Sequence, residues 1–101
     1  MDEPFRIFYE EFHERAADIV EKEVVIEEDL TEIAHETYET TANRLLHQMD
    51  MPEDEALELT RSFGRAMKTW IGRDHQDWDE LLELLEAAQM EWESTRGISA
   101  L

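Results

Sequence analysis

Residues 77–92 read Asp-Trp-Asp-Glu-Leu-Leu-Glu-Leu-Leu-Glu-Ala-Ala-Gln-Met-Glu-Trp. The apolar residues of this stretch recur at the three- and four-residue spacing of an amphipathic helix: Trp78, Leu81, Leu82, Leu85, Ala88 and Trp92. Asp77 suits the N-cap of that helix, because Glu80 follows three residues later as in a capping box. We expect this helix to have the largest apolar surface in the chain, so that the other helices pack around it.

The same periodicity predicts three more helices. The four expected helices cover about residues 4–26, 30–49, 52–71 and 77–93, with a short tail over 94–101. Their connections are short, which favours antiparallel neighbours. The sequence therefore predicts an all-α protein, a single acidic helical domain folded as a compact up-and-down antiparallel four-helix bundle.

Local signals set the expected helix boundaries. Asp29 and Asp50 are placed to cap the second and third helices, and Pro52 suits the first turn of the third. Gly72 is suited to end the third helix and Gly97 to end the fourth. The β-branched run over residues 24–26 is a poor helix former, so a short extended connection there is the alternative to a longer first helix.

The third helix has a clear apolar face and one glycine close to it. Gly64 is expected to allow a close helix approach, at a cost of about 1 kcal/mol relative to alanine. The residues predicted to point inward are Ala56, Leu57, Thr60, Phe63, Met67, Trp70 and Ile71.

The composition is dominated by acidic residues. The chain has 101 residues, of which 27 are acidic and 9 basic, so its formal net charge is −18. Direct binding to DNA, RNA or an anionic membrane is disfavoured, because all of these are polyanions. The chain has no cysteine, which excludes disulfides and thiolate metal sites, and no apolar run approaches the roughly 20 residues of a membrane span. The acidic N-terminus lacks the apolar core of a signal peptide, so we expect a cytoplasmic protein.

The acidic excess has two interpretations. It is spread along the chain, since residues 1–50 carry 15 acids and 4 bases and residues 51–101 carry 12 acids and 5 bases. One interpretation is a solvated acidic surface, as in a self-assembling structural module of a salt-adapted cytoplasm. The other is a face that binds a basic partner, including a protein that normally binds nucleic acid.

Two Glu-x-x-His pairs suggest a metal-binding alternative. Glu10 and His13 form one pair and Glu32 and His35 the other, a motif that ferritin-like di-iron bundles use to bind iron. On a helical wheel, however, Glu10 lies about 140° and Glu32 about 165° from the apolar centre of its helix. A carboxylate on the outer face cannot reach partners inside a bundle. The iron or zinc alternative therefore favours a surface or intersubunit site, and the main expectation is no cofactor.

The sequence lacks the usual marks of a hydrolase or a nucleotide-binding enzyme. The serines are Ser62, Ser94 and Ser99, and none lies in a glycine-framed nucleophile elbow. The 3 glycines are isolated and cannot build a phosphate-binding loop. We therefore expect a non-enzymatic protein with no catalytic residues.

One basic feature stands out against the acidic background. Arg61, Arg65 and Lys68, the basic stripe, recur at helical spacing beside the apolar face of the third helix. We expect them to neutralise carboxylates of an adjacent helix. The functional alternative is an edge that contacts anions or an acidic helix of a second copy. A homodimer is also suggested by Leu84 and Met90, which lie off the main apolar face of the fourth helix.

The main functional hypothesis is an acidic helical interaction protein that docks on a basic surface of a protein partner. It would act as an inhibitor, an antitoxin-like partner, an accessory subunit or a nucleic-acid mimic. Leu84 and Met90 are the candidate apolar anchors. The candidate contact carboxylates are Glu10, Glu14, Glu21, Glu28, Glu32, Glu36, Glu39, Asp79, Glu80, Glu83 and Glu86.

Overall fold

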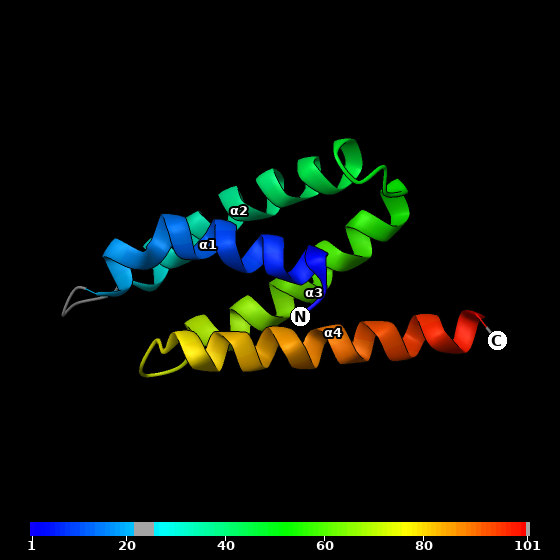
Figure 1. Cartoon of the computed structure of the whole chain (residues 1–101). Coiled ribbons are helices and arrows are strands. Elements are labelled where there is room, and N and C mark those ends of the chain that lie inside the picture. Colours follow the sequence, from blue (N-terminus) through cyan, green and yellow to red (C-terminus); the bar gives the residue numbers. More distant parts are fainter. Residues whose placement is uncertain (22–25, 101) are drawn as a thin grey trace.

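The described residues fold into four α-helices that run alternately up and down (Figure 1). The computed structural model describes residues 1–21 and 26–100, and for residues 96–100 it describes the backbone alone. The helices are α1 (Glu3–Val20), α2 (Glu27–His47), α3 (Glu53–Ile71) and α4 (Trp78–Ala100), and the described residues contain no strand. The prediction of an all-α, antiparallel four-helix bundle is confirmed.

The core is built mainly from aromatic residues of α1 and α3. Phe8 of α1 stacks on Phe63 of α3 with ring centroids 4.6 Å apart, and Phe12 meets the edge of Trp70 at 5.7 Å. All four side chains are fully buried. The indole of Trp70 donates a hydrogen bond of 2.8 Å to the carbonyl of Asp77, so the largest core side chain also has its polar atom satisfied.

Helix α4 is not the centre of the bundle, contrary to the expectation from its apolar stripe. Leu81 and Leu85 are buried against the core, but α4 packs on α3 and α1 and makes no contact with α2 within the described residues. Its C-terminal end extends past the start of α1 (Figure 1). The reason is that α1 and α3 contribute bulkier aromatic side chains, and these occupy the space between the helices.

The first connection differs from its prediction. Helix α1 ends at Val20 rather than near Ile26, and residues 22–25 lie outside the described part of the chain. Helix α2 begins at Glu27, because the extended Ile26 occupies the N-cap position and its carbonyl accepts the N–H of Leu30 at 3.2 Å. Asp29 therefore lies inside the first turn and does not cap it. Its charge still favours the positive end of the helix dipole.

The turn between α2 and α3 also differs from its prediction. Asp50 does not cap α3; it adopts a left-handed backbone with φ of 50°. This conformation turns the chain back, so that the N–H of Met51 reaches the carbonyl of Leu45 at 3.0 Å. Pro52 occupies the N-cap position of α3, one residue before the first turn where it was expected.

Of three further predicted helix boundaries, two agree with the structure and one does not. The N–H of Asp79 donates to the Asp77 carboxylate at 2.9 Å, so Asp77 caps α4 as predicted. Gly72 ends α3, with a right-handed backbone. Gly97 does not end α4, which continues to Ala100. A single glycine costs a helix about 1 kcal/mol, which is too little to stop it where nothing else opposes it.

The face of α3 is rotated relative to its prediction. Leu57, expected inside, has 51 % of its surface exposed, whereas Leu59 is fully buried. The core face is centred on Phe63, Met67 and Trp70, and Leu59 lies on the same side of the helix as these residues. Gly64 is not needed for a close helix approach within the chain, because a Cβ there would lie 3.8 Å from the hydroxyl of Tyr38, at ordinary contact distance.

Candidate functional site

The predicted contact carboxylates lie mostly on the solvent faces of three helices. We name the three groups by helix: the α1 row is Glu10, Glu14 and Glu21, the α2 row is Glu28, Glu32, Glu36 and Glu39, and the α4 row is Asp79, Glu83 and Glu86. Each row falls on one side of its helix, or just past its end for Glu21, and all ten residues are exposed. No side-chain ion pair engages any of the ten within the described part of the chain.

Glu80 differs from these ten carboxylates. It is half-buried, and its Oε2 accepts a hydrogen bond of 2.9 Å from Arg73 in the α3–α4 connection. Both side chains are about two-fifths exposed, at 40 % for Arg73 and 42 % for Glu80, so the pair contributes little to stability. Glu80 is thus already partnered, and it is a poorer candidate for a contact than its neighbours on α4.

The two predicted apolar anchors behave differently. Met90 is 69 % exposed and lies on the same side of α4 as the α4 row, at helical spacing from Glu83 and Glu86. Leu84 is half-buried and packs against the core, so its predicted exposure is wrong. Only Met90 retains the exposed position on which both the anchor hypothesis and the homodimer hypothesis depend.

A polar seam between α1 and α2 was missed by the sequence analysis. Glu11 accepts hydrogen bonds from Arg15 at 2.6 Å and from Arg44 at 3.0 Å, and Arg15 also donates to the hydroxyl of Thr40. The hydrogen bond from Arg15, followed by the positive charges of both arginines, lowers the pKa of Glu11 despite its burial. The i, i+4 spacing of Glu11 and Arg15 indicates their ion pair from sequence. Arg44 is 33 residues from Glu11, so no local pattern indicates its contact.

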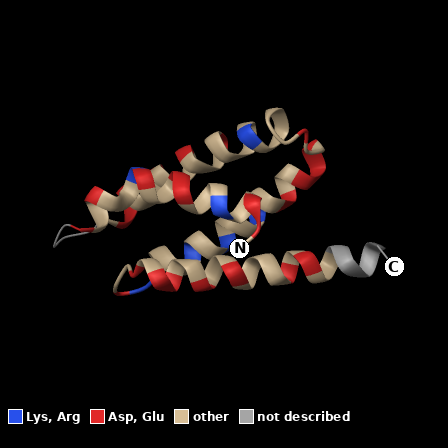
Figure 2. Ribbon diagram, viewed as in Figure 1, with Lys and Arg blue, Asp and Glu red and all other residues tan. Residues whose placement is uncertain are grey.

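The basic stripe is exposed and free of ion pairs. The four described ion pairs use Arg6, Arg15, Arg44 and Arg73. Arg61, Arg65 and Lys68 form none with a described carboxylate, and Arg65 donates only to the hydroxyl of Ser62 at 3.3 Å. The expectation that the stripe neutralises an adjacent helix is therefore wrong for the part of the chain that the structure describes. Figure 2 shows Lys and Arg positions in blue along α3.

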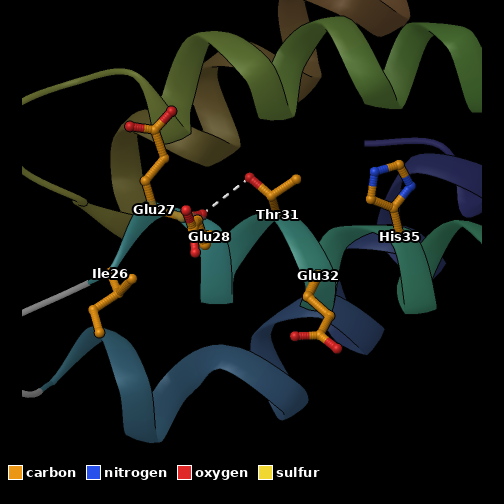
Figure 3. A pocket seen from close by; sticks show the side chains of 6 residues that line it. All are labelled: Ile26, Glu27, Glu28, Thr31, Glu32 and His35. Atoms are coloured by element: carbon orange, nitrogen blue, oxygen red, sulfur yellow. Dashed lines mark hydrogen bonds between the residues drawn. The ribbon is translucent and has the colours of Figure 1, made fainter.

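A groove runs between α2 and α3 beside the basic stripe. It contains two hollows of about 320 and 280 Å³ that share Tyr38 as a lining residue. We call this surface the α2–α3 groove. From α2 it is lined by Glu27, Thr31, Ala34, His35, Tyr38, Glu39, Ala42 and Leu46, and from α3 by Glu53, Ala56, Leu57, Thr60, Gly64, Lys68 and Ile71. A third hollow of about 870 Å³ adjoins it at the start of α2, where His35 points toward α3 and Glu32 points to the other side (Figure 3).

Tyr38 forms the floor of this groove. Its ring stacks on Phe8 with centroids 5.7 Å apart, and the edge of His35 meets it at 5.6 Å. Burial raises the pKa of Tyr38 to about 12, so its hydroxyl stays protonated over the physiological range. The tyrosine is therefore a neutral, partly apolar element between charged helix edges.

The structure does not bring the two Glu-x-x-His pairs together. His13 packs on Trp78 of α4 with ring centroids 4.5 Å apart, whereas His35 lies in the α2–α3 groove. Within the described residues, no three His, Asp or Glu side chains are close enough to hold one metal ion. The iron or zinc alternative would therefore need ligands from a second copy.

Two exposed features combine charge with apolar surface: the α4 row with Met90, and the α2–α3 groove with the basic stripe and Leu57. Among the described residues, none of the helices has the length and apolar character that crossing a membrane requires. Comparisons of the chain with protein-family models, with curated proteins and with solved structures gave no match.

Proposed function

We propose that the chain is a non-enzymatic interaction protein whose acidic helix faces dock on a basic surface of a protein partner. The observation that supports this most directly is the arrangement of the α1, α2 and α4 rows. Their ten carboxylates are exposed and have no ion-pair partner within the described residues, so their charge is available to another molecule. The protein would act as an inhibitor, an antitoxin-like partner, an accessory subunit or a nucleic-acid mimic.

The spacing of the rows favours a partner that normally binds nucleic acid. Asp79, Glu83 and Glu86 are separated by four and three residues, which corresponds to about 6 and 4.5 Å along the helix axis. Phosphates of one DNA strand repeat every 3.4 Å of the duplex axis. A row of carboxylates on a rigid helix therefore has a charge spacing of the same order as a phosphate backbone, and arginines and lysines that bind one are suited to the other.

Long-range electrostatics would bring the partners together. A net charge of −18 on 101 residues attracts a basic protein over a distance of about one Debye length, roughly 10 Å at 0.1 M salt. The exposed Met90 would then add apolar contact at one end of the α4 row. This mechanism predicts fast association that slows as salt rises.

The test is an affinity capture from lysate of the source organism with the native chain and with neutralised variants as bait. The α4-row variant is Asp79→Asn/Glu83→Gln/Glu86→Gln, and equivalent triple variants are made for the α1 and α2 rows. The control, Glu53→Gln/Asp54→Asn/Glu58→Gln, removes the same charge from exposed positions of α3 outside the rows. We expect one stoichiometric partner that at least one row variant loses and the control retains. If all variants, including the control, lost the partner equally, binding would depend on net charge alone. That result would contradict a specific docking face.

A further inference from the structure

A second surface combines features that the acidic rows lack. Leu57 is 51 % exposed near the start of α3, beside a hollow of about 280 Å³ formed with Tyr38, Ala42 and Leu46 of α2. That volume is several times the roughly 30 Å³ that one water molecule occupies. An exposed leucine beside an open, mainly apolar hollow is typical of the centre of a protein interface.

The two edges of the α2–α3 groove carry opposite charge. On the α3 side lies the basic stripe, whose three residues are the described cations outside ion pairs. On the α2 side lie Glu27 and Glu39, which line the two hollows and are exposed and without ion pairs in the described residues. In a chain with 27 acidic residues, the three cations on one edge leave positive charge free to contact another molecule.

We propose that the α2–α3 groove is the interface at which two copies of this chain form a twofold symmetric dimer. A partner for this surface needs an apolar centre with an acidic edge on one side and a basic edge on the other. A second copy of the same surface has these features. An isologous interface is self-complementary in this way. The proposal concerns a surface different from the α1 and α4 rows and shares Glu39 with the α2 row; it does not depend on the proposed function.

Charge selects the direction of the twofold axis. If the axis lay across the helices, α2 would face α2 and the acidic edges would meet, which is repulsive. If the axis runs along the groove, α2 of each copy faces α3 of the other. In this second arrangement, the acidic edge of each copy faces the basic edge of the other, so two attractive contacts form.

The levels of the residues along the groove fit the second arrangement. Glu39 lines the hollow that Leu57 and Thr60 line from α3, so it lies at the level of Arg61. Toward the start of α2, Glu27 lines the hollow that Gly64 and Lys68 line from α3. A rotation about an axis along the groove preserves these levels. It therefore pairs Glu39 with Arg61 and Glu27 with Lys68 of the other copy.

The same rotation places apolar groups together at the centre. Leu57 of each copy then meets the hollow beside Ala42 and Leu46 of the other, at the level where these residues face it within one chain. Burial of two exposed leucines against apolar walls supplies the attraction, and the charged edges fix the register.

The net charge sets the conditions under which the dimer forms. Two chains of charge −18 repel each other at long range. Salt screens this repulsion, because the Debye length falls from about 30 Å at 0.01 M to about 3 Å at 1 M, whereas contacts buried in the interface are screened much less. We expect the native chain to sediment as a monomer at low salt and as a dimer at about 0.5 M salt.

Sedimentation velocity of designed variants tests the proposal. Arg61→Glu/Lys68→Glu makes both edges acidic, and Glu27→Lys/Glu39→Lys makes both edges basic. At about 0.5 M salt, each variant alone should be monomeric, and an equimolar mixture should form a dimer with one copy of each. Leu57→Glu should abolish the native dimer, whereas the matched control Met49→Glu, at an exposed apolar position outside the groove, should retain it.

The outcomes that overturn the proposal are equally direct. A native chain that stays monomeric over the whole salt range, or a dimer that survives Leu57→Glu, excludes this interface. A mixture of the two edge variants that stays monomeric excludes the pairing of α2 with α3. The substituted positions are all exposed, so circular dichroism of each variant should match that of the native chain, and this check separates loss of the dimer from loss of the fold.

Discussion

Arg44 of α2 donates a hydrogen bond from Nη1 to Oε1 of Glu11 of α1 at 3.0 Å. The other carboxylate oxygen of Glu11 accepts from Arg15 at 2.6 Å, so one acidic side chain joins two cations across the first helix pair. Glu11 is 19 % exposed, and the two arginines are 35 % and 31 % exposed. In a chain whose other carboxylates mostly face solvent, this partly buried triad is the main polar contact that links α1 to α2.

Removing the charge of Glu11 should therefore destabilise the protein. We expect Glu11→Gln to lower the free energy of unfolding at pH 7 by about 1–2 kcal/mol, because charge-assisted hydrogen bonds in a partly buried site are lost. Urea unfolding followed by circular dichroism measures the change. The control is Glu10→Gln, an exposed neighbour without an ion pair, which should change stability by less than about 0.5 kcal/mol.

The same contribution should depend on pH. The pKa of Glu11 is lower in the folded protein than its ordinary value of 4.5, so the folded state releases this proton more readily than the unfolded state. The stabilisation is complete above pH 4.5 and is lost as the pH falls toward the lowered value. The difference between native and Glu11→Gln proteins should shrink on acidification; a difference that is the same at pH 7 and pH 3 would contradict the assignment.

Thr41 carries a buried hydroxyl that has no hydrogen-bond partner among the described residues. It is fully buried, as is Thr37 one turn earlier, whose hydroxyl donates to the carbonyl of Ile33 at 2.7 Å. Thr41→Val should raise the free energy of unfolding by about 1 kcal/mol, because it removes an unsatisfied polar group at nearly constant shape. Thr37→Val is the matched comparison and should give no such gain. Equal effects of the two substitutions would show that the hydroxyl of Thr41 is satisfied.

Gly64 should tolerate a side chain in the single chain. The nearest atom to an added Cβ is the Tyr38 hydroxyl at 3.8 Å, so Gly64→Ala gains helix propensity without a clash. We expect a rise of up to about 1 kcal/mol in the free energy of unfolding, measured at low salt. Gly72→Ala should gain less, because Gly72 lies past the last residue of α3 and its Cβ would lie 3.3 Å from the carbonyl of Lys68. A loss of stability in Gly64→Ala would show that α2 and α3 approach more closely than described here.

The left-handed residue between α2 and α3 gives a prediction of backbone strain. Asp50 is exposed and has a φ of 50°, a region that costs most residues about 1–2 kcal/mol and glycine almost nothing. Asp50→Gly should be neutral or stabilising by up to about 1 kcal/mol, whereas Asp50→Val should destabilise by more than 1 kcal/mol. Thermal unfolding of the two variants distinguishes this account from one in which the Asp50 carboxylate caps α3, which predicts a loss in both.

The sequence predicted the features that depend on local pattern. The periodicity of α4, the capping role of Asp77 and the end of α3 at Gly72 are set by residues a few positions apart, and all three agree with the structure. The acidic rows are exposed as predicted because charged residues opposite an apolar stripe face water.

The features that failed depend on contacts between helices. Leu57 and Leu59 lie on opposite edges of the apolar stripe of α3, and the aromatic residues of α1 decide which edge is buried. The bond between Arg44 and Glu11 joins residues far apart in sequence, and the α2–α3 groove exists only after the two helices pack. The side chain of Asp50 suits a helix cap, which is why the sequence predicts that role. Its left-handed backbone conformation is set by the turn as a whole.

The central claim is that the rows of free carboxylates bind a basic protein surface, and the measurement that tests it most directly is the salt dependence of that affinity. The dissociation constant of the captured partner should be measured at about 0.05 and 0.5 M salt for the native chain, the α4-row variant and the α3 control. We predict that the affinity of the native chain falls at least tenfold over this range. We also predict that the α4-row variant binds more weakly than the α3 control and that its affinity depends less on salt. An affinity that is the same at both salt concentrations, or no partner captured at either, would contradict the account.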